Sequence, residues 1–430
     1  MRLSLHSFKL WAALGVCAVL AACGGGGGSD SSASTSTPNS NPQTSTIQGN
    51  TSISQVIASP GANAAALTVA QAPAPSGVVV ANVPMVSVVV CSTTSQSSCT
   101  TVNNIQVDTG SSGLRVLSSA LTSILPTLAQ VPAPGGANVL AECMSFADGT
   151  AFGSVRDATV TVAGETATNI PIEVIGDGTT PQPTNGQPGT CESLTNQSTP
   201  DLLHANGILG VGTAPNDCAS CIAGSDSSSY FTCVSGSSCS PLSSHTVLTT
   251  AQVVVNPVTK FPVDNNGVII ELPSVAATGA PTVTGALVFG IGTQANNGLG
   301  SAQVLQTDAF GNISTTFQGT TVSSSFFDSG SNSLFFASSG VTLCSDGTFY
   351  CPASTQSFSA MLAGTNGVNA SINFSVANAD TLTASGNFAF NDQAGTTASF
   401  FSTFGPTFDW GLPAFYGRNV FTSIAGTTIS

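Results

Sequence analysis

Two short segments with one shared pattern hold the residues of this chain that are best suited to chemistry. Both follow an apolar run and precede another, and they lie far apart in the sequence. Their residues are Asp108-Thr109-Gly110-Ser111-Ser112 and Asp328-Ser329-Gly330-Ser331. Two carboxylates a few ångströms apart cannot both ionise cheaply, so one keeps a proton at a pH where an isolated Asp would lose it. Such a pair can take a proton from water and donate another to a carbonyl oxygen, which is general acid–base hydrolysis of an amide.

The residues around each aspartate are suited to holding it in place. Gly110 and Gly330 permit a tight turn. Nearby hydroxyl groups can bond to backbone or carboxylate oxygens, and they belong to Thr109, Ser111, Ser329 and Ser331. A single Asp-x-Gly is ordinary turn chemistry. Because two such turns in equivalent contexts are much rarer, we predict that Asp108 and Asp328 act together as a catalytic pair.

Histidine is too scarce for rival hydrolytic chemistries. The chain has three histidines and no Gly-x-Ser-x-Gly segment that would present a serine nucleophile. Serine hydrolases usually need a histidine base, and catalytic zinc usually takes two or three histidine ligands. We therefore expect neither a metal nor a cofactor.

Charge is equally scarce. Charged residues make up 6% of the chain, with six Lys+Arg and 20 Asp+Glu and a formal net charge of −14. Six scattered cations cannot form the basic stripe that binds nucleic acid. The hydrophobic fraction of 41% excludes an acidic disordered chain. We therefore expect a folded protein with a large hydrophobic core.

Taken together, the two segments resemble those of the pepsin-like aspartic peptidases, in which two β-rich lobes each supply one Asp-Thr/Ser-Gly loop to a shared cleft. Residues 206–212 resemble the element that buttresses the first loop, and residues 286–292 the strand and glycine turn that open the second lobe. Residues 411–421 are a looser match to the last buttress. The likeness covers roughly residues 80–425, and it extends to a narrower group of bacterial lipoproteins of uncharacterised function.

The resemblance also implies a flap hairpin over the cleft, with Phe146, Asp148 and Gly149 at its turn. Two residues there depart from the family: Phe146 replaces the flap tyrosine, and Arg115 replaces the tryptophan that partners it. A cation–π contact between Arg115 and Phe146 would replace the lost pair. In the second loop Asn332 stands where a small hydroxyl residue is usual, which predicts a weaker hold on the second aspartate.

The apolar runs are short, rich in Val, Ile, Thr and Phe, and separated by Gly, Asn, Asp, Ser and Pro, which is typical of strands joined by tight turns. The clearest runs are residues 85–91, 105–107, 158–162, 268–272, 286–289 and 372–376. A short helix is predicted around residues 118–130. We predict an all-β, bilobal pepsin-like fold, with residues 56–255 as the N-terminal lobe and residues 256–430 as the C-terminal lobe.

The N-terminus has the pattern of an export signal. Residues 1–22 combine basic residues, an apolar run too short to span a bilayer, and small residues before Cys23. This resembles a bacterial lipobox, which predicts lipidation of Cys23, a flexible Gly/Ser/Thr/Pro tether over residues 23–55, and a cell-envelope location with the outer membrane favoured. The body would then lie in the periplasm or at the cell surface. The alternative is an ordinary cleavage site with an incidental cysteine.

An even number of further cysteines in an exported chain predicts disulfides. They are Cys91, Cys99, Cys143, Cys191, Cys218, Cys221, Cys233, Cys239, Cys344 and Cys351. The close pairs Cys91–Cys99 and Cys344–Cys351 would staple loop ends. The pairing within the group of four between residues 218 and 239 stays open, and a zinc site is its alternative.

Three hypotheses about function follow. The first is a monomeric, lipid-anchored endopeptidase that acts on peptide or protein substrates. The second is a binding module that keeps the fold but does not use the aspartates, and the third is a structural lipoprotein in which the Asp-Gly turns are only turns. The spatial separation of Asp108 and Asp328 distinguishes the first from the other two.

Overall fold

The computed structural model describes residues 44–47, 55, 57–94, 97–180, 191, 195–397 and 406–429. The predicted signal peptide, the lipidation site Cys23 and most of the predicted tether lie outside the described residues. Among the helices in the described part of the chain, none is both long and apolar enough to cross a membrane.

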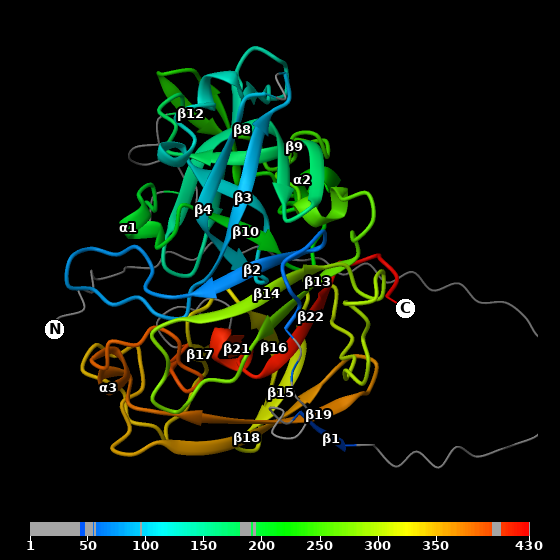
Figure 1. Ribbon diagram of the computed structural model, residues 1–430. Helices are drawn as coiled ribbons and strands as arrows, with labels where there is room; N and C mark the ends of the chain where they lie inside the picture. The colour runs from blue at the N-terminus through cyan, green and yellow to red at the C-terminus, as the bar shows by residue number, and fades with distance from the viewer. Residues whose placement is uncertain are drawn as a thin grey trace, which may run out of the picture.

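Strands make up most of the regular secondary structure in the described residues and form two sheets, the larger of which extends from the N-terminal lobe into the region between the lobes (Figure 1). The 14-stranded sheet contains β2 (Ala64–Val69), β3 (Pro84–Ser92), β4 (Cys99–Asp108), β5 (Ser112–Leu117), β6 (Ala129–Gln130), β7 (Val139–Ser145), β8 (Thr150–Val162), β9 (Glu165–Ile175), β10 (Gly207–Val211), β11 (Tyr230–Val234), β12 (Ser238–Pro241), β13 (Gly267–Leu272), β14 (Val283–Phe289) and β22 (Arg418–Ser423). The eight-stranded sheet contains β1 (Thr44–Ile47), β15 (Ile313–Phe317), β16 (Thr320–Asp328), β17 (Leu334–Phe335), β18 (Gln356–Ala363), β19 (Asn369–Val376), β20 (Ala394–Gly395) and β21 (Thr407–Gly411).

Helices in the described residues are few and short. They are α1 (Pro200–Leu203), α2 (Ala219–Ala223), α3 (Ala379–Thr383) and the 3₁₀ turns η1 (Ser118–Ala120), η2 (Leu125–Thr127), η4 (Pro257–Lys260) and η5 (Leu412–Ala414). The predicted all-β class is confirmed, and each of the clearest apolar runs lies within a strand. The predicted helix over residues 118–130 is wrong: Pro126 sits in the first turn of η2, and Leu128 is already extended, so only two separate 3₁₀ turns form.

The N-terminal lobe is a closed barrel, because β8 pairs with β3 as well as with β9. The C-terminal lobe is built on β15, β16, β18, β19 and β21. Between the lobes, β2 pairs with β14, and β13 and β22 continue the same sheet (Figure 1). The two halves that meet at residue 256 therefore share one continuous sheet.

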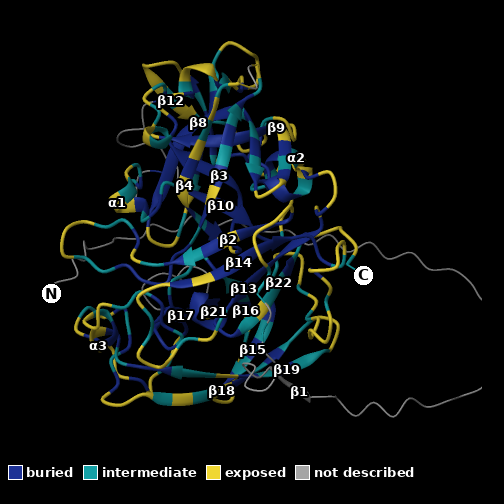
Figure 2. Ribbon diagram, viewed as in Figure 1, coloured by how far each residue is buried: buried dark blue, intermediate teal, exposed yellow. Residues whose placement is uncertain are grey.

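Alternation of apolar and polar residues along the strands builds the core. Val86, Val88 and Val90 of β3 are buried while their neighbours are more exposed, as a strand with one buried face requires. Figure 2 shows buried residues along the strands and exposed residues in the connecting loops. The core of the C-terminal lobe is aromatic, with Phe408 stacked on Trp410 at 4.3 Å between ring centroids.

The predicted flexible tether is wrong for four of its residues. Strand β1 pairs in parallel with β19, with Thr44 opposite Asn369 and Ile47 opposite Ile372. Without β1, strand β19 would be the edge of its sheet, and an edge strand offers unpaired backbone groups to any extended segment. Thr and Ile favour the extended conformation, so this piece of the tether joins the sheet.

The described residues form five disulfides, and none of these joins the two halves of the chain. They are Cys91–Cys99, Cys143–Cys191, Cys218–Cys221, Cys233–Cys239 and Cys344–Cys351. The group of four therefore forms two local pairs, which leaves no free thiolates there for the alternative zinc site. Four of the bridges join residues at most 8 positions apart and staple local turns or hairpins, whereas Cys143–Cys191 joins residues 48 positions apart.

Candidate active site

Asp108 is the last residue of β4, and the loop that follows it contacts the C-terminal lobe. Strand β10 runs parallel to β4 with Gly210 opposite Asp108, and antiparallel to β5. A Cβ on Gly210 would lie 2.7 Å from the backbone nitrogen of Ser112, so only glycine lets β10 approach the loop this closely. The buttress predicted at residues 206–212 is thus in place.

Asp328 occupies the equivalent position in the C-terminal lobe. It ends β16, and β21 runs parallel to β16 with Gly411 opposite Asp328, and antiparallel to β17. The backbone N–H of Leu412 donates to the Ser331 carbonyl at 2.8 Å. The second buttress therefore lies at Thr407–Gly411, a few residues before the predicted stretch of 411–421, which continues into η5 and β22.

The two loops are interlocked by four reciprocal hydrogen bonds. The backbone N–H of Thr109 donates to Ser329 Oγ at 3.1 Å, and that of Ser329 donates to Thr109 Oγ1 at 2.9 Å. Each hydroxyl then donates across to the other lobe, Thr109 to the Phe327 carbonyl at 3.1 Å and Ser329 to the Val107 carbonyl at 2.8 Å. Every polar atom in this crossing has a partner, which fixes the two loops relative to one another.

This crossing brings the carboxyl groups of Asp108 and Asp328 face to face. A Cβ on Gly330 would lie 2.5 Å from Asp108 Oδ1 and 3.1 Å from Asp328 Oδ1, and a Cβ on Gly110 would lie 2.6 Å from Asp328 Cγ. Burial, the charge of Asp108 and a hydrogen bond with it raise the pKa of Asp328 well above its usual value. Asp108 is buried while Gly110 is exposed, so the pair lies at the border between core and solvent.

Local donors hold each carboxylate. The N–H of Gly110 donates to Asp108 Oδ1 and that of Gly330 donates to Asp328 Oδ1, each at 2.7 Å. Ser111 donates to Asp108 Oδ2, and Ser331 donates to Asp328 Oδ2 at 2.9 Å. The second aspartate is therefore held by the same set of bonds as the first.

Asn332 and Ser112, the remaining two loop positions, form hydrogen bonds with residues outside the pair of aspartates. Asn332 uses its backbone carbonyl to accept from Asn82. Since Ser331 already binds Asp328, the weaker hold predicted from Asn332 is not found. Ser112 is the first residue of β5, directly after the first loop, and its hydroxyl donates to the Ala214 carbonyl at 2.8 Å.

The predicted hairpin at residues 146–149 is present between β7 and β8. The N–H of Phe146 donates to the Gly149 carbonyl at 2.8 Å, and Phe146 packs against the cluster that contains Leu117 and Ile208. Asp148 accepts a hydrogen bond from Gln197 at 3.0 Å. The hairpin turn therefore lies beside β5 and β10, the strands that flank the first aspartate loop.

Arg115 does not lie in an open cleft beside Phe146, and the predicted cation–π contact is wrong. Its guanidinium is completely buried and donates to Glu142 at 2.5 Å. Carboxyl oxygens of Glu173 and Asp217 lie 3.2 Å and 3.6 Å from guanidinium nitrogens. The guanidinium also donates to the Ser112 carbonyl at 2.9 Å. A buried cation needs carboxylate partners, and this cluster supplies them, so Arg115 braces the first loop from inside the barrel.

The buried cluster contains more carboxyl groups than cations. Burial and the neighbouring Glu142 carboxylate raise the pKa of Glu173 and of Asp217 well above their usual values. Burial alone would lower the pKa of Arg115, but the three carboxyl groups outweigh it and raise the pKa. Tyr230 donates to Asp217 at 2.9 Å and completes the cluster.

Stability is expected to fall as the pH rises above about 4, the usual pKa of Asp and Glu side chains. The raised pKa values of Glu173 and Asp217 mean that the folded state keeps protons which the unfolded state loses. Their contribution is complete below the unfolded-state pKa values and is lost as the pH rises through the folded-state values. Urea unfolding at a series of pH values measures this slope.

A variant with Glu173→Gln and Asp217→Asn should flatten the slope, whereas Asp201→Asn, on the exposed side of α1, should leave it unchanged. An equally steep slope in the double variant would contradict the assignment to this cluster.

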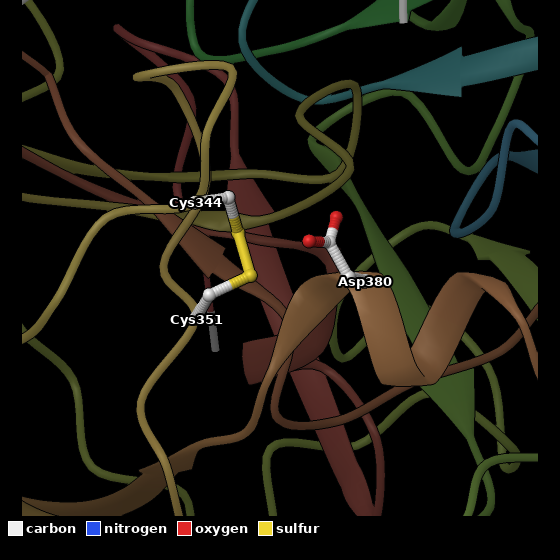
Figure 3. A group of neighbouring side chains, drawn as sticks. All are labelled: Cys344, Cys351 and Asp380. Carbon is white, nitrogen blue, oxygen red and sulfur yellow. A yellow bond between two sulfur atoms is a disulfide. The ribbon is translucent and has the colours of Figure 1, made fainter. Parts of the chain in front are cut away.

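One group of side chains has the spacing of metal ligands. Figure 3 shows Cys344, Cys351 and Asp380, whose ligand atoms lie within 4.8 Å of one another. The two sulfurs are bonded to each other, so they are not free thiolates, and Asp380 is the one remaining donor. A metal needs several such donors at once, and this group in its oxidised form does not supply them.

Reasoning from the sequence missed the partners of Arg115 and one further acid. Glu142, Glu173 and Asp217 reach the cluster from separate strands and loops, and Asp409 lies in β21 behind Asp328. A usable signal was present: in a chain with 6% charged residues, an acid inside an apolar strand needs a structural or chemical reason.

Two β-rich lobes that join two Asp-Thr/Ser-Gly turns are the arrangement expected from the sequence. The chain belongs to the family described as "Protein of unknown function (DUF3443)", whose model matches residues 59–430. Among curated proteins, none matches this chain. Among solved structures, it is similar to the aspartic proteinase from Irpex lacteus, at 17% identity and a TM-score of 0.46 over 85% of this chain and 98% of that chain.

Proposed function

We propose that this protein is an aspartic endopeptidase that hydrolyses peptide bonds with water activated between Asp108 and Asp328. The observation that carries the proposal is the pair of facing carboxyl groups held by matched donors from two interlocked loops. Such a pair titrates as a unit, and the raised pKa of Asp328 supports a state with one shared proton.

The geometry supports a simple sequence of proton transfers. Asp108 takes a proton from a water molecule as the water oxygen attacks the carbonyl carbon, and Asp328 gives its proton to the carbonyl oxygen. The proton on Asp108 then passes to the leaving nitrogen as the C–N bond breaks, while Asp328 recovers a proton from the intermediate. One water is consumed, and both carboxyl groups return to their starting state.

We further infer that the protein is a monomer anchored by a lipid on Cys23 in the cell envelope, with the outer membrane favoured and with peptide or protein substrates. The export signal and the cysteine that follows it support this inference. Fractionation of cells that express Cys23→Ser is the test. Release of the variant from the membrane fraction is expected, and an unchanged distribution would contradict the anchor.

Digestion of a peptide library between about pH 3 and 7, the range in which one shared proton is expected, tests the activity. Cleavage that pepstatin inhibits is expected. The absence of cleavage at every pH tested would contradict the proposal. Binding of peptides without turnover would instead favour a binding module that keeps the fold.

Gly110→Ala is expected to lower kcat/KM by about 100-fold, because a shift of about 1 Å in a reacting group has an effect of that size. The new Cβ would lie 2.6 Å from Asp328 Cγ, so the two carboxyl groups must move apart. Kinetics on the best library peptide measure the loss. Gly298→Ala is the matched control, because a Cβ there meets nothing within 4 Å; equal activity of the two variants would contradict the prediction.

A further inference from the structure

A third carboxyl group, that of Asp409, lies on the same side of the sheet as Asp328. In the parallel pairing of β16 and β21, Asp409 stands opposite Phe326, and Gly411 stands opposite Asp328. Residues two apart on a strand face the same side of a sheet. Asp409 is therefore one pleat behind the catalytic pair, about 7 Å along the strand direction.

The Asp409 side chain has no regular partner of its own. Its exposed fraction is 0%, and within the described residues neither carboxyl oxygen has a hydrogen bond of normal geometry. A buried carboxylate without partners is costly, so the group favours its protonated form. Burial and then the charge of Asp328 raise the pKa of Asp409 well above its usual value.

Ser331 links the two acids. Its hydroxyl donates to Asp328 Oδ2 at 2.9 Å, and the same hydroxyl acts on the pKa of Asp409, which it lowers. The loop is held against β21, since the Leu412 N–H donates to the Ser331 carbonyl. A serine hydroxyl has one hydrogen, so Ser331 can donate to only one of the two carboxyl groups at a time.

We propose that Asp409 is a positioning residue and a third proton site of the pair, which acts on Asp328 through Ser331. When Asp409 is protonated, it donates to Ser331 Oγ, and the serine hydrogen stays on Asp328. When Asp409 loses its proton, the serine hydrogen turns towards Asp409. Asp328 then loses a donor and faces a second negative charge.

Both changes favour the protonated form of Asp328. Asp409 therefore lets the pair keep its shared proton to a higher pH than two aspartates alone would. In the described part of the chain, the groups that act on Asp409 are Asp328 from β16, Asp108 from β4 and the Ser331 hydroxyl. The residue opposite it on β17 is Phe335, which adds no charge. The effect on rate rests on the proposed peptidase function, while the proton coupling does not.

Carboxyl-carbon NMR of the full chain with ¹³C-labelled aspartate tests the coupling without any substrate. Asp409→Asn keeps the shape and always supplies a donor, as the protonated acid does. The apparent pKa of Asp328, assigned by loss of its signal in Asp328→Asn, is expected to fall by about one unit in Asp409→Asn. An unchanged value would overturn the proposal.

Asp392→Asn is the control, because Asp392 is another buried acid of the same lobe, with a pKa raised by burial to about 6. It should leave Asp328 unchanged. If Asp409→Asn does not fold, the Asp328 signal in Asp108→Asn decides, because Asp108 no longer couples to it: a two-step titration of Asp328 there supports the proposal, and a one-step titration overturns it.

The pH profile of peptide cleavage separates the two proposals. Its alkaline limb should move down by the same amount in Asp409→Asn. If the pKa of Asp328 shifts in Asp409→Asn but no variant cleaves peptides, the coupling between the two acids is supported and only the proposed peptidase function is contradicted. If peptides are cleaved but the pKa of Asp328 does not shift in Asp409→Asn, only the proposed role of Asp409 is contradicted.

Discussion

Asp108→Asn is expected to lower kcat/KM by about 10²- to 10⁴-fold, the range usual for loss of a general acid–base group. The amide keeps one oxygen, which can accept from either Gly110 or Ser111 but not from both as the carboxylate does, and it cannot take a proton from water. Because the charge of Asp108 is one cause of the raised pKa of Asp328, that pKa should also fall. Steady-state kinetics and carboxyl NMR measure the two effects.

Loss of activity in this variant should not come from unfolding. Removing one of two facing carboxyl groups relieves repulsion, so the Tm should stay the same or rise. Asp346→Asn is the matched control, because Asp346 accepts from the N–H of Thr348 in a turn of the C-terminal lobe and should keep full activity. Undiminished cleavage by Asp108→Asn would rule out the proposed chemistry.

Arg115→Met is expected to lower the free energy of unfolding by about 3–5 kcal/mol at neutral pH, the range for removing one partner of a buried ion pair. The change leaves Glu142, Glu173 and Asp217 without their cation. The side chains of Glu142 and Glu173 are completely buried. The change also removes the bond to the Ser112 carbonyl. Urea unfolding gives the free energy.

The loss should shrink at pH 4, where protonated carboxyl groups no longer need the cation. Adding Glu142→Gln to Arg115→Met should recover part of the stability, because it removes an unpaired charge. Lys260→Met, at an exposed cation, should change stability by less than about 0.5 kcal/mol. A loss below 1 kcal/mol in Arg115→Met would contradict a structural role for the cluster.

The facing aspartates were predictable because their signal is local. Each aspartate, its glycine and its two hydroxyl residues lie within one short segment, and the same segment occurs twice. The all-β class and the first buttress were predictable for the same reason, since alternation and turn residues are read over short windows.

The surroundings of Arg115 were not predictable in this way. Its partners come from β7, β9 and the segment before α2, and nothing in their own neighbourhoods marks them as a cluster. The position matched a family tryptophan, which suggested a cation–π contact with Phe146, but Arg115 is buried among three acids instead. Strand β1 was missed because its polar residues are typical of a flexible linker. They form a strand through backbone pairing with β19, which lies far away in the sequence.

Hydrolysis of the best library peptide in ¹⁸O-labelled water tests the central claim most directly. Direct attack by water activated between Asp108 and Asp328 predicts one ¹⁸O atom in the new carboxyl group at early times, with no enzyme-bound acyl intermediate detectable by mass spectrometry. Products free of ¹⁸O, a trapped acyl-enzyme, or the same yield from a variant that lacks both aspartates would contradict the account.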